Sequence, residues 1–333
     1  MRRSSRKERE QGLSRLGKAR VAVIGDFCLD VYWQADMTKS ELSRETPHFP
    51  LPIVGERMSP GGAGNVVMNL LALEPRSVAA VGVFGDDWRG AALRNLLRKA
   101  GADVSGVVVD STRVTNAYIK PLRKGFADTV IYEDPRLDFT NYSALSVGSE
   151  RRLLAALDRA AAAADVLCVC DQMPFGCITE KVRRRIVELG RAGMTVVADS
   201  RDRIGLYTDV IVKPNEIEAA RVFDGAIPSA DFAALAVALE QRTGRPAIVT
   251  CGEKGCYVSE GGSATHVPAV KVTGEIDFCG AGDTFLSALA ASLGGGSALV
   301  EAATIACAAS SVTIRKLRTT GTASRAEIAD VRQ

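Results

Sequence analysis

Histidine is nearly absent from this sequence of 333 residues, which contains only His48 and His266, far apart in the chain. A metal site built on several histidines is therefore excluded. The eight cysteines are scattered, and five lie inside apolar runs, where a free thiol behaves as a small hydrophobic group: Cys28, Cys168, Cys170, Cys251 and Cys307. A zinc site formed by Cys168, Cys170 and Cys177 is the alternative. The composition indicates a reduced, cytoplasmic protein.

Long apolar runs are also lacking. No stretch approaches 18 uninterrupted apolar residues, so no membrane span is predicted. The net charge of +3 is too small to indicate a nucleic-acid partner, and much of it lies in the first twenty residues, with eight Lys and Arg against Glu8 and Glu10. This start has no apolar h-region and is not a secretory signal. We expect residues 1–18 to form a flexible basic lead-in that turns briefly helical at Leu13 and Leu16, with a targeting or nucleic-acid-binding tail as the alternative.

Two common nucleotide-binding motifs are missing. The glycine-rich segment 277–284 is not a GxxxxGK[ST] loop, because no lysine occupies the required position. The first predicted strand is followed by Gly25-Asp26-Phe27-Cys28 and not by G-x-G-x-x-G. A dinucleotide-dependent oxidoreductase is therefore only weakly supported.

Short β-branched runs alternate with helical stretches along most of the chain. The runs expected to form strands are 21–24, 77–84, 166–170, 195–198, 210–212 and 247–250. The stretches expected to form helices are 64–73, 88–100, 151–164 and 184–192. Such alternation predicts an α/β fold with three layers (αβα) and a mainly parallel central sheet covered on both faces.

Two segments, about 30–58 and 107–132, break this rhythm. Both alternate polar and apolar residues, and the first contains prolines. They are predicted to form antiparallel strands that stand off the main sheet as a small β lid, a dimer surface or both. Because no internal repeat or low-complexity linker separates them from the rest, residues 19–330 are expected to form one domain.

The segment 277–284 leads directly into an apolar helix predicted over 285–293. A helix start offers unpaired N–H groups to an anion, and small residues let the backbone approach it closely. The small residues here are Gly280, Ala281 and Gly282. A carboxylate such as Asp283 would repel phosphate, but its presence is explained if it accepts the proton of an attacking hydroxyl. The alternative is a tight turn with Asp283 as an ordinary acid of the first helical turn.

Two further carboxylates, Asp26 and Asp30, follow the first predicted strand. A polyol is bound by carboxylate acceptors, and the carboxyl ends of parallel strands are where α/β sheets bind ligands. Both residues are therefore candidates for a substrate site. The alternative for Asp26 is a residue that stabilises the turn through its own backbone neighbours.

The run Asp277-Phe278-Cys279-Gly280-Ala281-Gly282-Asp283 resembles the D-x-x-G-A-G-D pattern of the ribokinase-like (PfkB) carbohydrate kinases. Their second pattern, a Gly-Gly pair followed by Asn, is matched by Gly61-Gly62-Ala63-Gly64-Asn65, about 215 residues earlier. The resemblance implies that Asp283 is the catalytic base and that Gly280 to Gly282 form the anion hole. It further implies that Asp30, Gly61, Gly62 and Asn65 contact the sugar.

The resemblance also implies ATP and Mg²⁺ as cofactors. Asn215 and Glu218 match the family's N-x-x-E element and would hold Mg²⁺ through water. Other positions would line the nucleotide: Thr250, Gly252, Gly255 and Cys307. Asp277 is the position implied for a monovalent cation. Taken alone, Glu216 and Glu218 are also typical of a helix start, and Gly252 with Gly255 of a hairpin turn.

Within the family the chain is most similar to the D-glycero-D-manno-heptose 7-phosphate kinases, through segments 23–33 and 60–69. These enzymes phosphorylate the anomeric hydroxyl of a sugar that already carries a phosphate. The resemblance covers about residues 18–325 and implies a homodimer formed through the lid. Lid cations could bind the sugar's phosphate or simply be solvated: Arg44, Lys120, Arg123 and Lys124.

The chain departs from the heptose kinases at 41–50, at 170–173, at Asp199-Ser200-Arg201 and at Cys279 and Cys307. None of these departures removes Asp283 or its glycines, but all affect expected substrate or nucleotide contacts. Two alternatives therefore stay open. The acceptor could be another sugar, sugar phosphate or nucleoside, or the protein could be a non-catalytic sensor of sugar phosphates.

Overall fold

The computed structural model describes residues 6–127, 131–317 and 320–331. In this part of the chain a nine-stranded sheet has the order β14-β13-β12-β11-β10-β9-β1-β4-β5. Pairing is parallel from β5 to β12, and only the last two pairings, β12 with β13 and β13 with β14, are antiparallel. Its strands are β1 (Arg20–Gly25), β4 (Ser77–Gly85), β5 (Asp103–Asp110), β9 (Val166–Asp171), β10 (Thr195–Ser200), β11 (Ile211–Val212), β12 (Ala247–Thr250), β13 (Cys256–Glu260) and β14 (Ser263–Val267). The prediction of an α/β fold with a mainly parallel sheet is confirmed.

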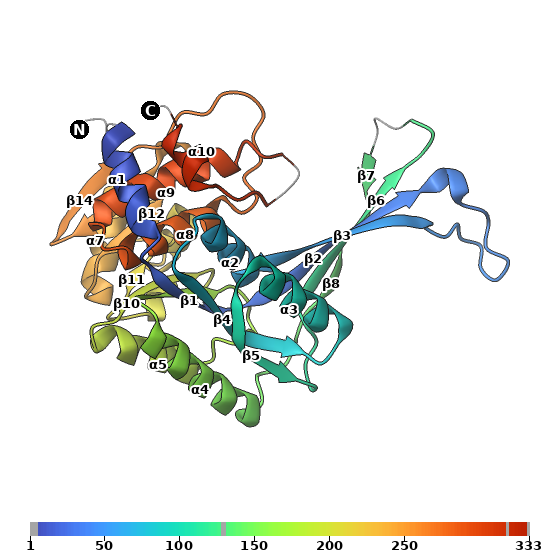
Figure 1. Cartoon of the computed structure of the whole chain (residues 1–333), viewed down its shortest axis with the longest axis horizontal. Coiled ribbons are helices and arrows are strands. Elements are labelled where there is room, and N and C mark those ends of the chain that lie inside the picture. Colours follow the sequence, from blue (N-terminus) through green and yellow to red (C-terminus); the bar gives the residue numbers. More distant parts are fainter. Residues whose placement is uncertain (1–5, 128–130, 318–319, 332–333) are drawn as a thin grey trace.

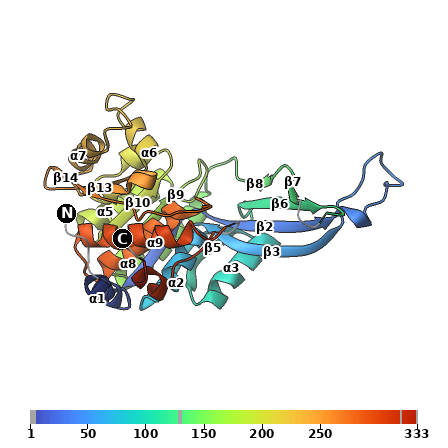
Figure 2. The same ribbon diagram turned by 90° about the horizontal axis from the view of Figure 1, so that it is seen from above.

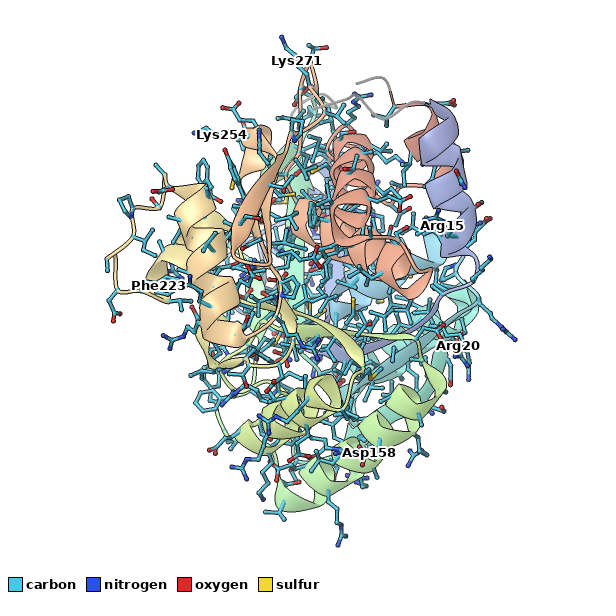
Figure 3. All side chains as sticks on the ribbon, turned by 90° about the vertical axis from the view of Figure 1, so that its left-hand side faces the viewer. Arg15, Arg20, Asp158, Phe223, Lys254 and Lys271 are labelled. Atoms are coloured by element: carbon cyan, nitrogen blue, oxygen red, sulfur yellow. The ribbon has the colours of Figure 1, made fainter. Side chains whose placement is uncertain are left out.

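Helices cover both faces of this sheet (Figures 1 and 2). One face carries α1 (Arg6–Leu16), α2 (Ala63–Ala72), α3 (Trp88–Ala100), α8 (Ala281–Gly294), α9 (Leu299–Thr313) and α10 (Arg325–Ala329). The other carries α4 (Val147–Ala163), α5 (Glu180–Arg191), α6 (Glu216–Arg221) and α7 (Phe232–Thr243). Along β1, Val21 and Val23 join the first core while Ala22 and Ile24 join the second, because successive strand side chains point to opposite faces. Figure 3 shows the side chains packed between these layers.

The predicted helix over 88–100 coincides with α3. The helix begins at Asp87, whose carboxylate accepts the N–H of Gly90, and it ends at Gly101 with a φ of +104°. A left-handed residue at this position is favourable for glycine and costly for other residues. The predicted bounds are confirmed, although Asp87 was not singled out in the sequence as the start signal.

A second, smaller sheet extends away from the large one and is called the lid sheet below (Figures 1 and 2). Its strands are β2 (Phe27–Asp36), β3 (Ile53–Gly62), β6 (Ala117–Lys124), β7 (Ile131–Glu133) and β8 (Leu137–Phe139). The strand β2 pairs antiparallel with β3 and parallel with β6. The expected lid boundary at 107 is corrected, because residues 107–110 belong to β5 at the edge of the large sheet. Residues 128–130 of the expected lid lie outside the described residues.

In its described part the expected lead-in is helical, which agrees with the helical turn expected at Leu13 and Leu16 and extends it back to Arg6. The helix α1 packs on the sheet's first face, and Leu13 and Leu16 are only 4% and 0% exposed. Burying two leucine side chains stabilises the fold by about 3 to 6 kcal/mol relative to leaving them in water. Residues 1–5 lie outside the described part.

Two absences in the described residues bear on function. None of the described helices has the length and apolarity that a membrane crossing requires. Within the same residues, no group of three or more His, Cys, Asp or Glu side chains could hold a metal ion. The zinc alternative fails because Cys168 and Cys170 join the core on one face of the sheet, whereas Cys177 joins the other.

Candidate active site

The start of α8 forms one wall of the candidate site. Gly280 precedes the helix with a φ of +80°, and a Cβ added there would lie 2.8 Å from Asn65 Nδ2. The N–H of Ala281 donates to the carbonyl of Phe278 at 3.1 Å. Among the described residues, the next two N–H groups, of Gly282 and Asp283, have no acceptor. A Cβ on Gly282 would meet nothing within 4 Å, so the helix start is uncovered at this residue. Free N–H groups at a helix start are suited to binding an anion.

Asp283 lies in the first turn of α8 and is partly buried. Its Oδ2 accepts a hydrogen bond from Asn65 Nδ2 of α2 at 2.7 Å. Burial raises the pKa of Asp283 to about 6, and the nearby Asp199 adds to this rise, whereas the Asn65 hydrogen bond and the Lys213 cation oppose it. A carboxylate with such a pKa is ionised at neutral pH and basic enough to accept a proton. The predicted pair Asn65 and Asp283, far apart in sequence, is brought together.

Gly61 of β3 pairs with Cys28 of β2, and the side chain of Asp30, two residues further along β2, reaches over it. A Cβ on Gly61 would collide with the Asp30 carboxylate, so glycine is required for this close approach. Burial raises the pKa of Asp30, and the cations Lys120, Arg136 and Arg57 oppose the rise. The predicted substrate residues Asp30, Gly61 and Lys120 thus lie on one part of the lid sheet, adjacent to the start of α2.

The carboxylate of Asp26 has other partners. It accepts the backbone N–H groups of Gln172, Met173 and Cys177 at 2.9, 2.8 and 2.7 Å, and it is 3% exposed. Burial raises the pKa of Asp26 to about 6, although the hydrogen bonds from these N–H groups lower it. The carbonyl of Asp26 also accepts the N–H of Ala63. Asp26 therefore holds the loop after β9 and the start of α2, a structural role that differs from the expected stabilisation of its own turn.

The expected Mg²⁺ side lies at the start of α6. Asn215 caps this helix: its Oδ1 accepts the N–H groups of Ile217 and Glu218, and Glu218 Oε2 accepts the N–H of Asn215 at 2.9 Å. The predicted pair is thus adjacent and also fulfils the helix-start alternative. Burial raises the pKa of Glu218, and Asp199 raises it further.

Lys213 and Asp199 are functional candidates that sequence reasoning missed. Lys213 is 3% exposed, and its Nζ lies 3.4 Å from Asp199 Oδ2. Burial lowers the pKa of Lys213, but Asp199 and Glu218 outweigh it and the net pKa is raised, so the ammonium stays charged. A signal was present, since Lys213 immediately precedes Pro214-Asn215. The three carboxylates of Asp199, Glu218 and Asp283 thus keep the Lys213 ammonium charged inside the protein.

The expected nucleotide residues gather beside α6. Thr250 forms a bridge with Asn215, and its N–H donates to the carbonyl of Pro214. In the turn that follows, Gly252 and Gly255 have φ values of +53° and +91°. A Cβ on Gly255 would collide with the Val267 carbonyl.

Two predicted residues remain, Cys307 and Asp277. Cys307 of α9 lies with its Sγ 3.9 Å from Cys256 Sγ of β13, behind the turn. Asp277 accepts the N–H of Cys279 at 2.9 Å, and its own N–H donates to Ile314. Asp277 thus braces the loop that leads to Gly280.

Cations and aromatic rings share one face of the lid sheet, and two of the cations were not predicted. The guanidinium of Arg57 lies 4.1 Å from the centre of the Tyr32 ring, and Lys120 Nζ lies 5.2 Å from the same ring. Arg136 lies 4.3 Å above Tyr118. We call Arg57, Lys120 and Arg136 with their two rings the lid cation face.

The other predicted lid cations do not join this face in the described contacts. Arg123 is paired with Asp134, and Arg44 is exposed in the segment between β2 and β3. Lys124 also has a partner.

Taken together, a helix start with free N–H groups, a carboxylate of raised pKa and a buried lysine among acids are features that phosphoryl transfer requires. The model of the pfkB family of carbohydrate kinases matches residues 18–326. The chain belongs to this family. Its members are carbohydrate kinases, enzymes that transfer a phosphoryl group to a sugar hydroxyl.

Curated relatives include bifunctional HldE proteins. That of Gluconobacter oxydans is 33% identical over 320 residues, covering 93% of this chain and 63% of that protein. That of Geotalea uraniireducens is 32% identical over 325 residues, covering 94% and 63%. The chain thus spans about three fifths of the length of the curated relatives it matches.

Solved structures show the same fold. Phosphofructokinase-2 from Escherichia coli, solved with substrates and products, matches with a TM-score of 0.71 at 19% identity, covering 94% of this chain and 98% of that one. Ribokinase from Arabidopsis thaliana, solved with ribose and ATP, matches with a TM-score of 0.67 at 17% identity and the same coverage. The prediction of a ribokinase-like fold is confirmed.

Proposed function

We propose that this kinase transfers the γ-phosphate of ATP to the anomeric hydroxyl of a sugar that already carries a phosphate, such as a heptose 7-phosphate. The observation that carries the proposal is the lid cation face. A neutral sugar needs hydroxyl and carboxylate partners, whereas a phosphorylated sugar also needs cations to offset its charge. The HldE relatives and the resemblance of segments 23–33 and 60–69 support the same acceptor.

The strand register supports a site with two ends. Tyr32 pairs with Arg57 of β3 and Lys120 of β6, and Asp30 lies two residues before Tyr32 on the same face of β2. Two residues of a strand span about 7 Å. A sugar held at Asp30 would therefore present its far end, where the existing phosphate lies, to Arg57 and Lys120.

In the proposed mechanism Asp283 accepts the proton of the sugar hydroxyl as that oxygen attacks the phosphoryl group. The open N–H groups of Gly282 and Asp283 stabilise the moving phosphoryl. Ala281, expected to contribute a third N–H, instead donates to Phe278. Asn65 keeps the Asp283 carboxylate oriented, and Lys213 offsets the charge of the nucleotide phosphates.

Magnesium, when bound, would neutralise charge on the β- and γ-phosphates. Glu218 and Asp199 supply the carboxylate oxygens that Mg²⁺ prefers, and Asn215 orients Glu218 through its N–H. The described residues contain no cage of three direct ligands. This fits an ion held largely by water and phosphate oxygens. A monovalent cation near Asp277 belongs to the same proposal, as does a homodimer through the lid.

An acceptor panel tests the proposed function. ADP release would be measured with D-glycero-D-manno-heptose 7-phosphate, the unphosphorylated heptose, fructose 6-phosphate, fructose, ribose and adenosine. We expect kcat/KM for the heptose 7-phosphate to exceed that for the free heptose by at least about 100-fold, since cation–phosphate contacts are worth about 3 kcal/mol. Equal values for the two heptoses would contradict a phosphate-binding role for the lid. The other arms would identify a different sugar, sugar phosphate or nucleoside as the acceptor.

A further inference from the structure

A buried chain of hydrogen bonds ends at Asp283. The hydroxyl of Thr284 in α8 donates to Asn69 Oδ1 of α2 at 2.8 Å. Asn69 Nδ2 donates to the backbone carbonyl of Asn65 at 2.9 Å and to Asn65 Oδ1 at 3.2 Å. Asn65 Nδ2 then donates to Asp283 Oδ2. Thr284, Asn69 and Asn65 are each at most 2% exposed, so water does not compete for these bonds.

The orientation of both amides follows from the backbone carbonyl of Asn65, which can only accept a hydrogen bond. The backbone carbonyl of Asn65 has no hydrogen to donate, so the neighbouring end of Asn69 must be its NH₂ group. Asn69 Oδ1 then faces Thr284, whose hydroxyl donates to it. The second N–H of Asn69 faces Asn65 Oδ1, which leaves the NH₂ group of Asn65 toward Asp283.

We propose that Thr284 and Asn69 are positioning residues that hold the Asn65 amide with its N–H toward Asp283. The proposal rests on the proposed role of Asp283 as the base. Neither residue touches the reacting atoms. Thr284 secures the Oδ1 end of the Asn69 amide, whose NH₂ end the Asn65 carbonyl already holds, so its loss loosens the hydrogen bond to Asp283 without reversing either amide.

The chemical consequence concerns the basicity of Asp283. A donated N–H stabilises the ionised carboxylate, whereas an opposed amide oxygen destabilises it. The other charged groups that act on Asp283 are Asp30 of β2 and Asp199 of β10, which raise its pKa, and Lys213, which lowers it. The buried thiols of Cys28 and Cys170 are also close enough to interact with it. Since none of these belongs to the chain of hydrogen bonds, losing Thr284 should change only the amide contribution.

Another buried hydroxyl joins the same two helices and provides a matched control. Ser287 Oγ lies 3.0 Å from the Val66 carbonyl of α2 and 2.7 Å from the Asp283 carbonyl, and the residue is fully buried. It does not contact either amide. Ser287→Ala therefore removes a helix-to-helix hydrogen bond without changing the amide chain.

The test compares Thr284→Val, which keeps the shape and removes the hydroxyl, with Thr284→Ser, which restores it, and with Ser287→Ala. Thr284→Ala serves as a second variant if Thr284→Val does not fold. The ionisation of Asp283 would be followed directly by NMR of ¹³C-labelled aspartate carboxyls in the whole enzyme without substrate, with Asp283→Asn identifying the resonance. This readout does not depend on which acceptor the enzyme uses.

We expect the midpoint of the Asp283 titration to move to higher pH in Thr284→Val and to return in Thr284→Ser, with no movement in Ser287→Ala. With any acceptor that the wild type phosphorylates, Thr284→Val should lose about threefold more kcat/KM than Thr284→Ser at pH 6, and the gap should close by pH 8. An Asp283 midpoint in folded Thr284→Val equal to that of the wild type would overturn the proposal. If the Asp283 midpoint moves as expected but no acceptor is phosphorylated, the result would count against the proposed function alone.

Discussion

The two ends of the active site are built differently. At the Asp283 end, helices α2 and α8 pack tightly, and buried amides and hydroxyls fix each polar atom through hydrogen bonds. At the lid end, Arg57 and Lys120 stack on Tyr32, on strands that extend away from the body. Buried networks fix geometry, whereas partly exposed cations attract charge and tolerate adjustment. We therefore expect the Asp283 end to control kcat and the lid end to control the affinity for the acceptor.

The largest effect should come from removing the base. Asp283→Asn keeps the hydrogen-bonding shape but cannot accept the proton, so kcat should fall by about 10³-fold while ATP affinity is little changed. Steady-state kinetics and calorimetric titration of ATP would measure both. Asp158→Asn changes an exposed residue of α4 (Figure 3) that pairs with Arg185 of α5; it is the control, and its kcat and ATP affinity should equal those of the wild type. A kcat of Asp283→Asn within tenfold of that of the wild type would contradict the assignment of kcat to the Asp283 end.

The next effect is the pH dependence at the same end. Because the pKa of Asp283 is raised to about 6 and the ionised form is active, kcat/KM should level off above about pH 7 and fall roughly tenfold per pH unit below 6. A pH series with one acceptor would show the acid limb. The residual activity of Asp283→Asn should lack this limb. An acid limb centred near pH 4 would mean that burial does not set the basicity of Asp283.

At the lid end the effect should be smaller and should appear in KM. Removing one charged contact to the acceptor's phosphate by Arg57→Ala should raise KM for a phosphorylated acceptor about tenfold, with kcat nearly unchanged. Lys120→Ala should behave alike, because both cations share Tyr32. Arg44→Ala removes a lid cation away from that ring and is the matched control. An equal loss in all three variants would show only a general charge effect.

The smallest effect on turnover should come from Asp26. Replacing it by alanine leaves three buried backbone N–H groups without their acceptor, so the free energy of unfolding should fall by about 3 kcal/mol, measured by urea denaturation. The KM for the acceptor should change little at a temperature where the variant is folded. A raised KM with unchanged stability would restore Asp26 to the substrate site.

Local signals predicted much of this molecule. The helix α3 was predicted over its full length, and Gly61, Gly62 and Gly280 occupy positions where a Cβ or an ordinary φ is excluded. The strand β5 was misplaced because it lies at the edge of its sheet, where one side is exposed and its residues alternate as lid strands do. Sequence alone could not distinguish these two environments.

The unpredicted site residues depend on pairings that a single sequence does not reveal. Arg57 reaches Tyr32 only through the register of β2 with β3. Asn69 and Thr284 are 215 residues apart and meet only when α2 packs on α8. Asp26 is the reverse case. It lies where the sequence predicts a substrate residue, but its carboxylate already accepts N–H groups from the loop after β9.

The way the lid sheet joins the body limits how it can move. A single residue, Asp26, separates β1 from β2, and β3 continues into α2 without any intervening residue. There is no linker at either crossing on which the two strands could swing as a rigid plate. Any approach of the lid to a bound sugar would therefore require the strands themselves to bend or twist, and the energy of that bending would be part of the energy of binding the acceptor.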